Sequence, residues 1–230
     1  MAVSQYLEHL GIQIASGLVI NTSHINKFGY NASLSNSIQT VHDAGGLYSY
    51  IETAGPATVT GQAGDTGAVV SVQGLDENYD AVTESVTLGG TTTANFIRVF
   101  RARLESHPSE DVNSSNITVT VDGSVRATIL ADKGQTLMAL YTIPRRTTGY
   151  LVKFQGSIEK SQEIVFKLFS RDVDNGVFNL KGQFGSFASP ITYDYPIPLM
   201  FKEKTDIEVR AIAGATAAGG AIFDLILVRK

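Results

Sequence analysis

Two runs of sequence, Val69-Val-Ser-Val-Gln-Gly-Leu75 and Val82-Thr-Glu-Ser-Val-Thr-Leu88, give the clearest indication of the fold class. Both runs are rich in β-branched residues with polar side chains interleaved, which is the pattern of a half-buried strand. The residues between them, Asp76–Ala81, are mostly turn formers, so the stretch is predicted to form a β-hairpin. We expect Val70 and Val72 to face the core, because successive side chains of a strand point to opposite faces.

The same strand pattern recurs along most of the chain after residue 55. Runs of this kind, separated by Gly, Pro, Asp, Asn or Ser clusters at roughly 8–12-residue spacing, are typical of an antiparallel sandwich or barrel. We therefore expect an all-β chain, an antiparallel β-sandwich of jelly-roll type, with about 40% strand or more and less than about 15% helix. The further strands are predicted at Phe96–Leu104, Ile117–Val121, Val125–Ala131, Thr136–Ile143, Tyr150–Glu159, Glu163–Ser170, Gly176–Gln183, Asp206–Ala213 and Ala221–Val228.

The N-terminal region differs from the rest of the chain. Residues 21–50 are dense in Asn, Ser, Thr and Gly, which favour turns and caps over strand ladders. We interpret residues 1–55 as an extended N-terminal arm that packs on neighbouring surfaces, and residues 56–230 as the β-sandwich domain. The alternative is that the polar stretch holds two edge strands of the same sandwich. A short helix at Ser4–Leu10, with Ser4 as its N-cap, also fits the start of the chain.

Four aromatic residues are spaced through this polar stretch. Phe28, Tyr30, Tyr48 and Tyr50 would supply most of the contact area of an arm that packs on another surface. We therefore name these four as the candidate partner interface.

The composition excludes several classes of protein and site. Cysteine is absent, which rules out disulfides, thiolate nucleophiles, iron–sulfur clusters and cysteine-ligated zinc. Charged residues make up only 17% of the chain, and the net charge is -4. An acidic chain with few basic residues binds phosphate backbones poorly, so no nucleic-acid partner is expected. No apolar run approaches the roughly 20 residues of a membrane span, so no membrane partner is expected either.

Histidines and sequence motifs give no sign of a catalytic site. The four histidines, His9, His24, His42 and His107, lack the three- or four-residue spacing of a helical zinc pair. The sequence also lacks a Gly-x-Ser-x-Gly elbow and the glycine-rich loops that bind phosphates. Carboxylate pairs for glycoside hydrolysis come from distant strands and escape a test by spacing, but the chain has no Trp to stack on a sugar. We expect no cofactor and no enzyme activity.

One short stretch resembles the opening of a calcium loop. Asp76, Asn78 and Asp80 alternate, so their side-chain oxygens can converge on one cation. The sixth position of the loop is Ala81, where the turn needs Gly, and the twelfth is Thr87, where the loop needs a bidentate carboxylate. Hairpin-turn chemistry explains the same residues without a metal, so we expect no metal site.

Basic residues gather at two places in the sequence. Arg98, Arg101 and Arg103 follow one predicted strand, and Arg145 and Arg146 occupy a turn between strands. The arginines on the strand could meet acidic partners, but a solvated sheet face is the default interpretation.

Six blocks of the chain form a distinctive series: Lys27-Phe-Gly-Tyr-Asn31, Val41-His-Asp-Ala-Gly-Gly-Leu-Tyr48, the hairpin Gly74–Gly89, Gln135-Thr-Leu-Met-Ala-Leu-Tyr-Thr-Ile-Pro144, Lys204-Thr-Asp-Ile-Glu-Val-Arg-Ala211 and Phe223-Asp-Leu-Ile-Leu-Val228. In order and spacing these blocks resemble a family of virion structural proteins of tailed bacteriophages. The resemblance brings no catalytic residues with it.

The resemblance implies a structural role on a phage particle. We expect a capsid decoration or cement protein that stabilises the head by bridging capsomers, on the capsid surface of a virion assembled in the bacterial cytoplasm. Its partners would be the major capsid protein or other virion proteins, and further copies of itself in a homotrimer. The absence of cysteine and the low charge of the chain fit this expectation.

Two other functions remain open at this point. The chain could be a tail, neck, baseplate or head-fibre protein with an adaptor or host-glycan-binding role. It could also be a glycan-degrading enzyme on the virion, which would require two carboxylates about 5–10 Å apart in a cleft.

Overall fold

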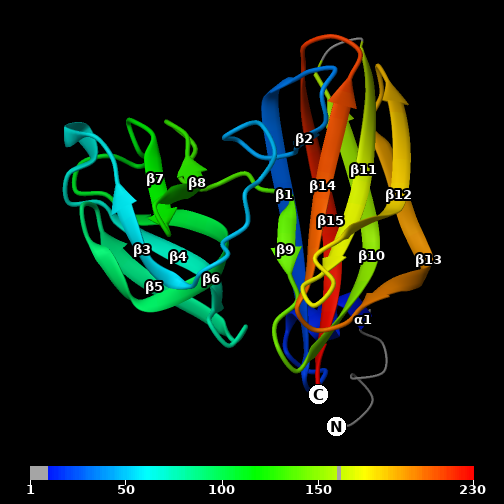
Figure 1. The fold of residues 1–230 in the computed structure, drawn as a ribbon, viewed down its shortest axis with the longest axis horizontal. Coiled ribbons are helices and arrows are strands. Elements are labelled where there is room, and N and C mark those ends of the chain that lie inside the picture. The colour runs from blue at the N-terminus through cyan, green and yellow to red at the C-terminus, as the bar shows by residue number, and fades with distance from the viewer. Residues whose placement is uncertain (1–9, 160–161) are drawn as a thin grey trace, which may run out of the picture.

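The computed structural model describes residues 10–159 and 162–230, and nearly all of its regular structure is β (Figure 1). Strands account for 61% and helices for 4%, which confirms the predicted all-β antiparallel class. One short helix, α1 (Leu10–Ala15), precedes the strands, and the helix predicted at Ser4–Leu10 lies outside the described residues except for Leu10. Among the described residues, no helix has the length and apolar character needed to cross a membrane.

The strands form two lobes that lie side by side (Figure 1). The sandwich lobe contains β1 (Thr22–Leu34), β2 (Gln39–Thr40), β9 (Leu140–Thr142), β10 (Thr147–Ile158), β11 (Glu163–Asp172), β12 (Phe178–Phe187), β13 (Ile191–Phe201), β14 (Thr205–Ala213) and β15 (Ala217–Arg229). The small lobe contains β3 (Gly55–Thr60), the 3-10 helix η1 (Ala63–Asp65), β4 (Val69–Asp76), β5 (Ala81–Thr87), β6 (Thr91–Ser106), β7 (Ile117–Val121) and β8 (Ser124–Ile129).

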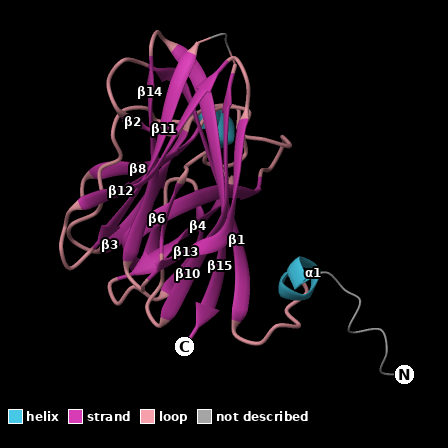
Figure 2. Cartoon of the chain, turned by 90° about the vertical axis from the view of Figure 1, so that its right-hand side faces the viewer, coloured by secondary structure: helices cyan, strands magenta, loops and turns pink. Residues whose placement is uncertain are grey.

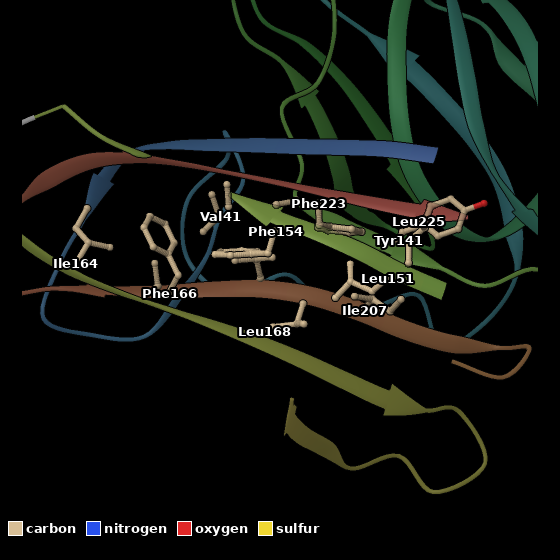
Figure 3. Close-up of a cluster of buried hydrophobic side chains, with 14 of the residues drawn as sticks. Val41, Tyr141, Leu151, Phe154, Ile164, Phe166, Leu168, Ile207, Phe223 and Leu225 are labelled. Carbon is tan, nitrogen blue, oxygen red and sulfur yellow. The ribbon is translucent and has the colours of Figure 1, made fainter. Parts of the chain in front are cut away.

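Two antiparallel sheets make up the sandwich lobe. One has the strand order β1-β15-β10-β13, and the other has the order β12-β11-β14-β2, with β9 also paired to β14. Their inner faces meet in one apolar core that contains Phe154, Phe166 and Phe223 (Figure 3). Alternate residues of β11 and β15 are buried, which is the period-two pattern that the sequence predicted for these strands.

The N-terminal polar stretch belongs to this sandwich, so the arm interpretation is corrected for residues 22–40. Strand β1 pairs with β15 along most of its length, and β2 pairs with β14. Both are edge strands, as in the alternative interpretation of the sequence. The strand pattern was hidden because the buried residues of β1 include Lys27, Gly29 and Asn31, which are polar or lack a side chain. A Cβ atom on Gly29 would lie 2.2 Å from the backbone of Val41 and Ala139, so glycine is required there.

The small lobe is a second structural unit with its own core, so the single domain predicted over residues 56–230 is also corrected. Its six strands form one sheet in the order β5-β4-β6-β3-β7-β8. Residues between β2 and β9 in the sequence supply this lobe, which therefore interrupts the sandwich. Phe96, Ile117 and Ile129 are buried in its hydrophobic cluster. Composition does not change at the boundary, so no sequence pattern marks a second core.

The predicted hairpin is confirmed in the small lobe. Strands β4 and β5 pair without a register shift, from Val69 opposite Thr87 to Leu75 opposite Ala81. Val70 and Val72 are fully buried, as expected. Ser71, on the opposite face of β4, is also fully buried, so this face is covered as well.

Candidate functional site

The described residues contain no cluster of three or more metal-ligating side chains of the types His, Cys, Asp and Glu. His24 lies 3.1 Å from Asp224, and His107 lies 3.3 Å from Asp65. His42 is buried beside the ring of Tyr48, and His9 lies outside the described residues. The described histidines therefore occupy three separate places.

The calcium-like stretch forms a tight turn. An Asp76 carboxylate oxygen, Oδ1, accepts hydrogen bonds from the backbone N–H groups of Asn78 and Asp80. Tyr79 adopts a left-handed conformation with a φ of 64°, and the Asp80 carboxylate pairs with Arg145 of the sandwich lobe. These contacts are the turn chemistry that the sequence offered as the explanation without a metal.

Two of the four candidate interface aromatics, Tyr48 and Tyr50, lie at the junction between the lobes. The Tyr48 hydroxyl donates to the carbonyl of Val99 in β6, at 3.0 Å. The Tyr50 hydroxyl donates to a carboxylate oxygen of Glu208 in β14, at 3.3 Å. Their rings meet edge to face, with centroids 4.9 Å apart. These tyrosines therefore connect the small lobe to the sandwich within one chain.

A buried charge network holds the same junction. Arg98, in the small lobe, donates two hydrogen bonds to the carboxylate of Asp206 in β14, at 2.8 and 3.1 Å. Arg171 of β11 donates to the same carboxylate, and so does the Thr142 hydroxyl, both at 2.6 Å. Asp206 is fully buried, so these partners compensate its loss of hydration. The prediction that Arg98 lies on a solvated sheet face is therefore wrong.

A second carboxylate extends the network. Glu208 is fully buried; it accepts a hydrogen bond from the Thr40 hydroxyl and pairs with Arg210 at 2.9 Å. Burial raises the pKa of the Tyr50 hydroxyl well above its usual value, and the negative charge of Glu208 raises it further. Tyr50 therefore stays protonated and acts as a hydrogen-bond donor.

Beside this network lies a cleft of about 370 Å³ between the lobes. Its walls include Tyr50, Tyr79, Arg98, Arg171 and Phe178. The Arg171 guanidinium packs against the rings of both Tyr50 and Phe178, at 4.2 and 4.8 Å from their centroids, and the two rings contact each other at 5.7 Å. Cations near aromatic faces are attracted by the ring quadrupole, so these contacts stabilise the junction.

A third group of contacts ties β1 to the small lobe. The buried Lys27 ammonium donates a hydrogen bond to the backbone carbonyl of Phe100 in β6. Burial lowers the pKa of Lys27 well below its usual value, and the nearby Arg101 charge lowers it further. Arg101 donates a hydrogen bond to the carbonyl of Asn26, also in β1, at 3.1 Å. Strand β6 is therefore fixed along the edge of the sandwich.

The other two candidate aromatics, Phe28 and Tyr30, are half-buried and line a groove of about 410 Å³. Phe28 pairs with Ile222 of β15, and both line this groove. The Tyr30 hydroxyl donates to Glu159 at 2.6 Å. Burial raises the pKa of Tyr30 to about 12, and Glu159 adds to this shift. The structure thus separates the four aromatics into two pairs.

One apolar part of the described surface was not singled out from the sequence. Strands β12 and β13 end the two sheets on the side of the sandwich away from the small lobe (Figures 1 and 2). We call this surface the β12–β13 edge. Its exposed large apolar side chains, with their exposed fractions, are Leu180 (50%), Phe187 (68%), Tyr193 (45%), Ile197 (84%) and Met200 (68%).

Charge is scarce along this edge. Between Phe178 and Phe201, Lys181 and Asp194 are the two charged residues of the sequence. Interface cores are depleted in charged residues, so the edge has the character of a protein-binding surface. The sequence signal was present as a low-charge run, but Pro196 and Pro198 argued against a strand at β13.

No protein-family model matches the chain, and no curated protein matches its sequence.

Proposed function

We propose that this chain is a structural protein of a bacteriophage virion, a capsid decoration or cement protein that stabilises the head by bridging capsomers. The observation that carries the proposal is the charge-poor, apolar β12–β13 edge on a body whose lobes are joined by buried contacts. A surface of this kind suits assembly with other proteins. The assignment to a virion rests on the resemblance of the sequence blocks described above.

The strand order supports the jelly-roll interpretation. The sandwich has four principal strands in each sheet, and consecutive strands from β12 to β15 alternate between the two sheets. On this interpretation the small lobe is an insertion between the second and third strands of the roll. Jelly rolls recur among viral capsid proteins and lectins, so the topology supports the proposal.

The proposed mechanism is mechanical. Packaged DNA pushes a capsid outward, and a protein bound across a seam between capsomers resists their separation through the area that it buries. A specific interface of standard size buries about 1,600 Å² in total, and attachment at several points multiplies the effect. The buried Arg98–Asp206 pair suits this role, because a brace transmits force only if its parts do not move relative to one another.

Among the four candidate interface aromatics, we assign contact with the shell to Phe28 and Tyr30. They line an open groove, whereas Tyr48 and Tyr50 make their hydrogen bonds at the junction within the chain. Large aromatic side chains at a groove supply contact area at low entropic cost.

The proposal is tested by counting copies of the chain in purified phage particles by quantitative mass spectrometry. A decoration protein should be present in hundreds of copies, because it follows the symmetry of the shell. A handful of copies would indicate a tail or neck protein instead. Particles carrying Phe28→Ala and Tyr30→Ala should lose the protein, whereas Tyr150→Ala, on another strand of the same sheet, should retain it.

A second candidate is a tail, neck or head-fibre protein that binds a host glycan. The observation that favours it is the cleft between the lobes, with Tyr50, Tyr79 and Phe178 in its walls. Binding on a glycan array that is lost in Tyr79→Ala would favour this candidate over the first.

A further inference from the structure

We infer that the β12–β13 edge is the surface through which copies of this chain associate, and that the β12 side of one copy packs on the β13 side of the next. This inference rests on the proposed function and deepens it, because it names the contact that builds the proposed homo-oligomer.

The backbone of this edge is poorly suited to strand pairing. In β12, Lys181 is an extra residue that has no partner in β11. In β13, Tyr195–Pro198 bulges out opposite Val152 of β10, and the bulge contains two prolines without N–H groups. Bulges, lysines and prolines are the features that protect open sheet edges from backbone pairing. A partner must therefore bind through side chains.

The exposed side chains are large enough to form an interface. The five apolar side chains of the edge together expose roughly 500–700 Å², since large side chains of this kind present about 150–250 Å² when fully exposed. An interface of standard size buries about 1,600 Å² on the two partners together, so these side chains, shared between two copies, would supply roughly a third or more of it.

The charge of the edge favours a second copy as the occupant. A surface rich in one sign of charge would repel an identical surface, but Lys181 and Asp194 are opposite in sign and sum to zero. The edge can therefore meet another copy of itself without a surplus of like charge.

The apolar side chains lie on two different sides of the edge. Leu180 and Phe187 pair with Phe169 and Glu163 of β11, so they lie on the outer face of that sheet. We call this the β12 side.

The β13 side faces in other directions. Met200 pairs with Tyr150, next to the core residue Leu151, and therefore lies on the outer face of the other sheet. Ile197 projects from the bulge, and Tyr193 closes the open side between the sheets, with its ring 5.6 Å from that of Phe184.

These two sides determine the kind of assembly. A two-fold contact would match one side with itself and leave the other exposed. A head-to-tail contact, in which the β12 side of one copy meets the β13 side of the next, covers both sides. Such contacts form a ring where the rotation between copies closes and an open filament where it does not, and the ring is the form that we expect. The small lobes would then point away from the axis, because they lie at the opposite end of the molecule (Figure 1).

The first test measures the mass of the full chain by light scattering across a range of concentrations. The wild type should be a ring, with trimer the expected size, and Ile197→Asp should reduce it to a monomer with an unchanged circular dichroism spectrum. The matched control is Ile20→Asp, because Ile20 is 83% exposed and precedes β1, which lies at the other end of the same sheet from β13. This control should remain a ring.

The second test uses the absence of cysteine in the natural sequence. Under mild oxidation, the double variant Leu180→Cys with Ile197→Cys should form covalent trimers on a denaturing gel. Each single variant alone should stay at the mass of one chain, because the two positions meet each other and not themselves. This test does not depend on the folding of Ile197→Asp.

Three results would overturn the inference. The first is a wild type that is monomeric at every concentration. The second is a ring that dissociates in Ile20→Asp but persists in Ile197→Asp. The third is the formation of covalent dimers by either single cysteine variant alone. A monomer that still occurs in hundreds of copies per particle would refute this inference and leave the proposed function standing.

Discussion

Asp206 shows how much of this molecule depends on single buried side chains. Its carboxylate is fully buried and accepts hydrogen bonds from Arg98, Thr142 and Arg171, which lie on three different strands in two lobes. Removal of the carboxylate would leave Arg98 buried without its charge partner. Breaking a buried pair in this way is costly because the remaining charge keeps its desolvation penalty.

We therefore expect Asp206→Ala to lower the free energy of unfolding by about 3–5 kcal/mol, measured by urea denaturation. The matched control is Asp194→Ala, since Asp194 forms an exposed pair with Lys153 at 3.8 Å. Exposed pairs contribute about 0–1 kcal/mol, so the control should change stability little. Equal losses in the two variants would contradict the role given to the network.

His42 and Asp43 titrate in opposite directions at neighbouring positions. Burial raises the pKa of Asp43 to about 7 and lowers the pKa of His42 to about 4. Between about pH 4 and 7, folded Asp43 holds a proton that the unfolded chain has released, so its contribution to stability falls as pH rises. Folded His42 lacks a proton that the unfolded chain holds, so its contribution rises with pH up to about 6.5.

The two effects should nearly cancel in the wild type, and single variants should reveal each of them. The free energy of unfolding of Asp43→Asn should rise as the pH is raised from 4.5 to 6.5, because only the His42 effect remains. That of His42→Gln should fall over the same range, because only the Asp43 effect remains. The slope is at most about 1.4 kcal/mol per pH unit for one group. Urea denaturation at several pH values measures it, and parallel pH profiles in both variants would refute the assignment.

The sequence could not predict this residue-level arrangement. Arg98, Arg171 and Asp206 come from positions far apart in the chain, and no local spacing links them. The four aromatics were recognised as contact residues, but Tyr48 and Tyr50 make their contacts inside the chain. Local sequence patterns indicate which side chains become buried, whereas the topology of the fold determines which residues they contact.

At the scale of elements, prediction worked where burial alternated along a strand. The β4–β5 hairpin was predicted nearly residue for residue, and β7 matches its predicted bounds, Ile117–Val121. Strand β13 was missed because Pro196 and Pro198 are poor strand residues, and the structure accommodates them in a bulge at a sheet edge. Strand β1 was missed because its inward positions include a lysine, a glycine and an asparagine.

Gly29 tests the placement of β1 in the sandwich. Gly29→Ala should destabilise the chain by about 1–3 kcal/mol or more, because its Cβ would overlap backbone atoms of Val41 and Ala139. The control is Gly185→Ala in β12, where a Cβ atom would meet nothing within 4 Å. Thermal and urea unfolding measure both variants. An arm that packs only on other molecules would tolerate both substitutions equally.

At the scale of the whole molecule, two cores are joined by buried contacts, and an apolar edge lies at the far end from the small lobe. The all-β class was predictable because strand periodicity is local. The division into two lobes was not, since an inserted β unit has the same composition and period as the sandwich that surrounds it. The low charge of the chain was interpreted as a sign of extensive protein contact, and the β12–β13 edge is one charge-poor surface of the described structure.

Electron cryo-microscopy of the intact phage particle tests whether this chain is a capsid decoration protein. We expect density that fits both lobes on the outer surface of the head, repeated with the symmetry of the shell, with the small lobes pointing away from each ring axis. Density confined to the tail or neck, or a shell surface without this chain, would refute the proposed function.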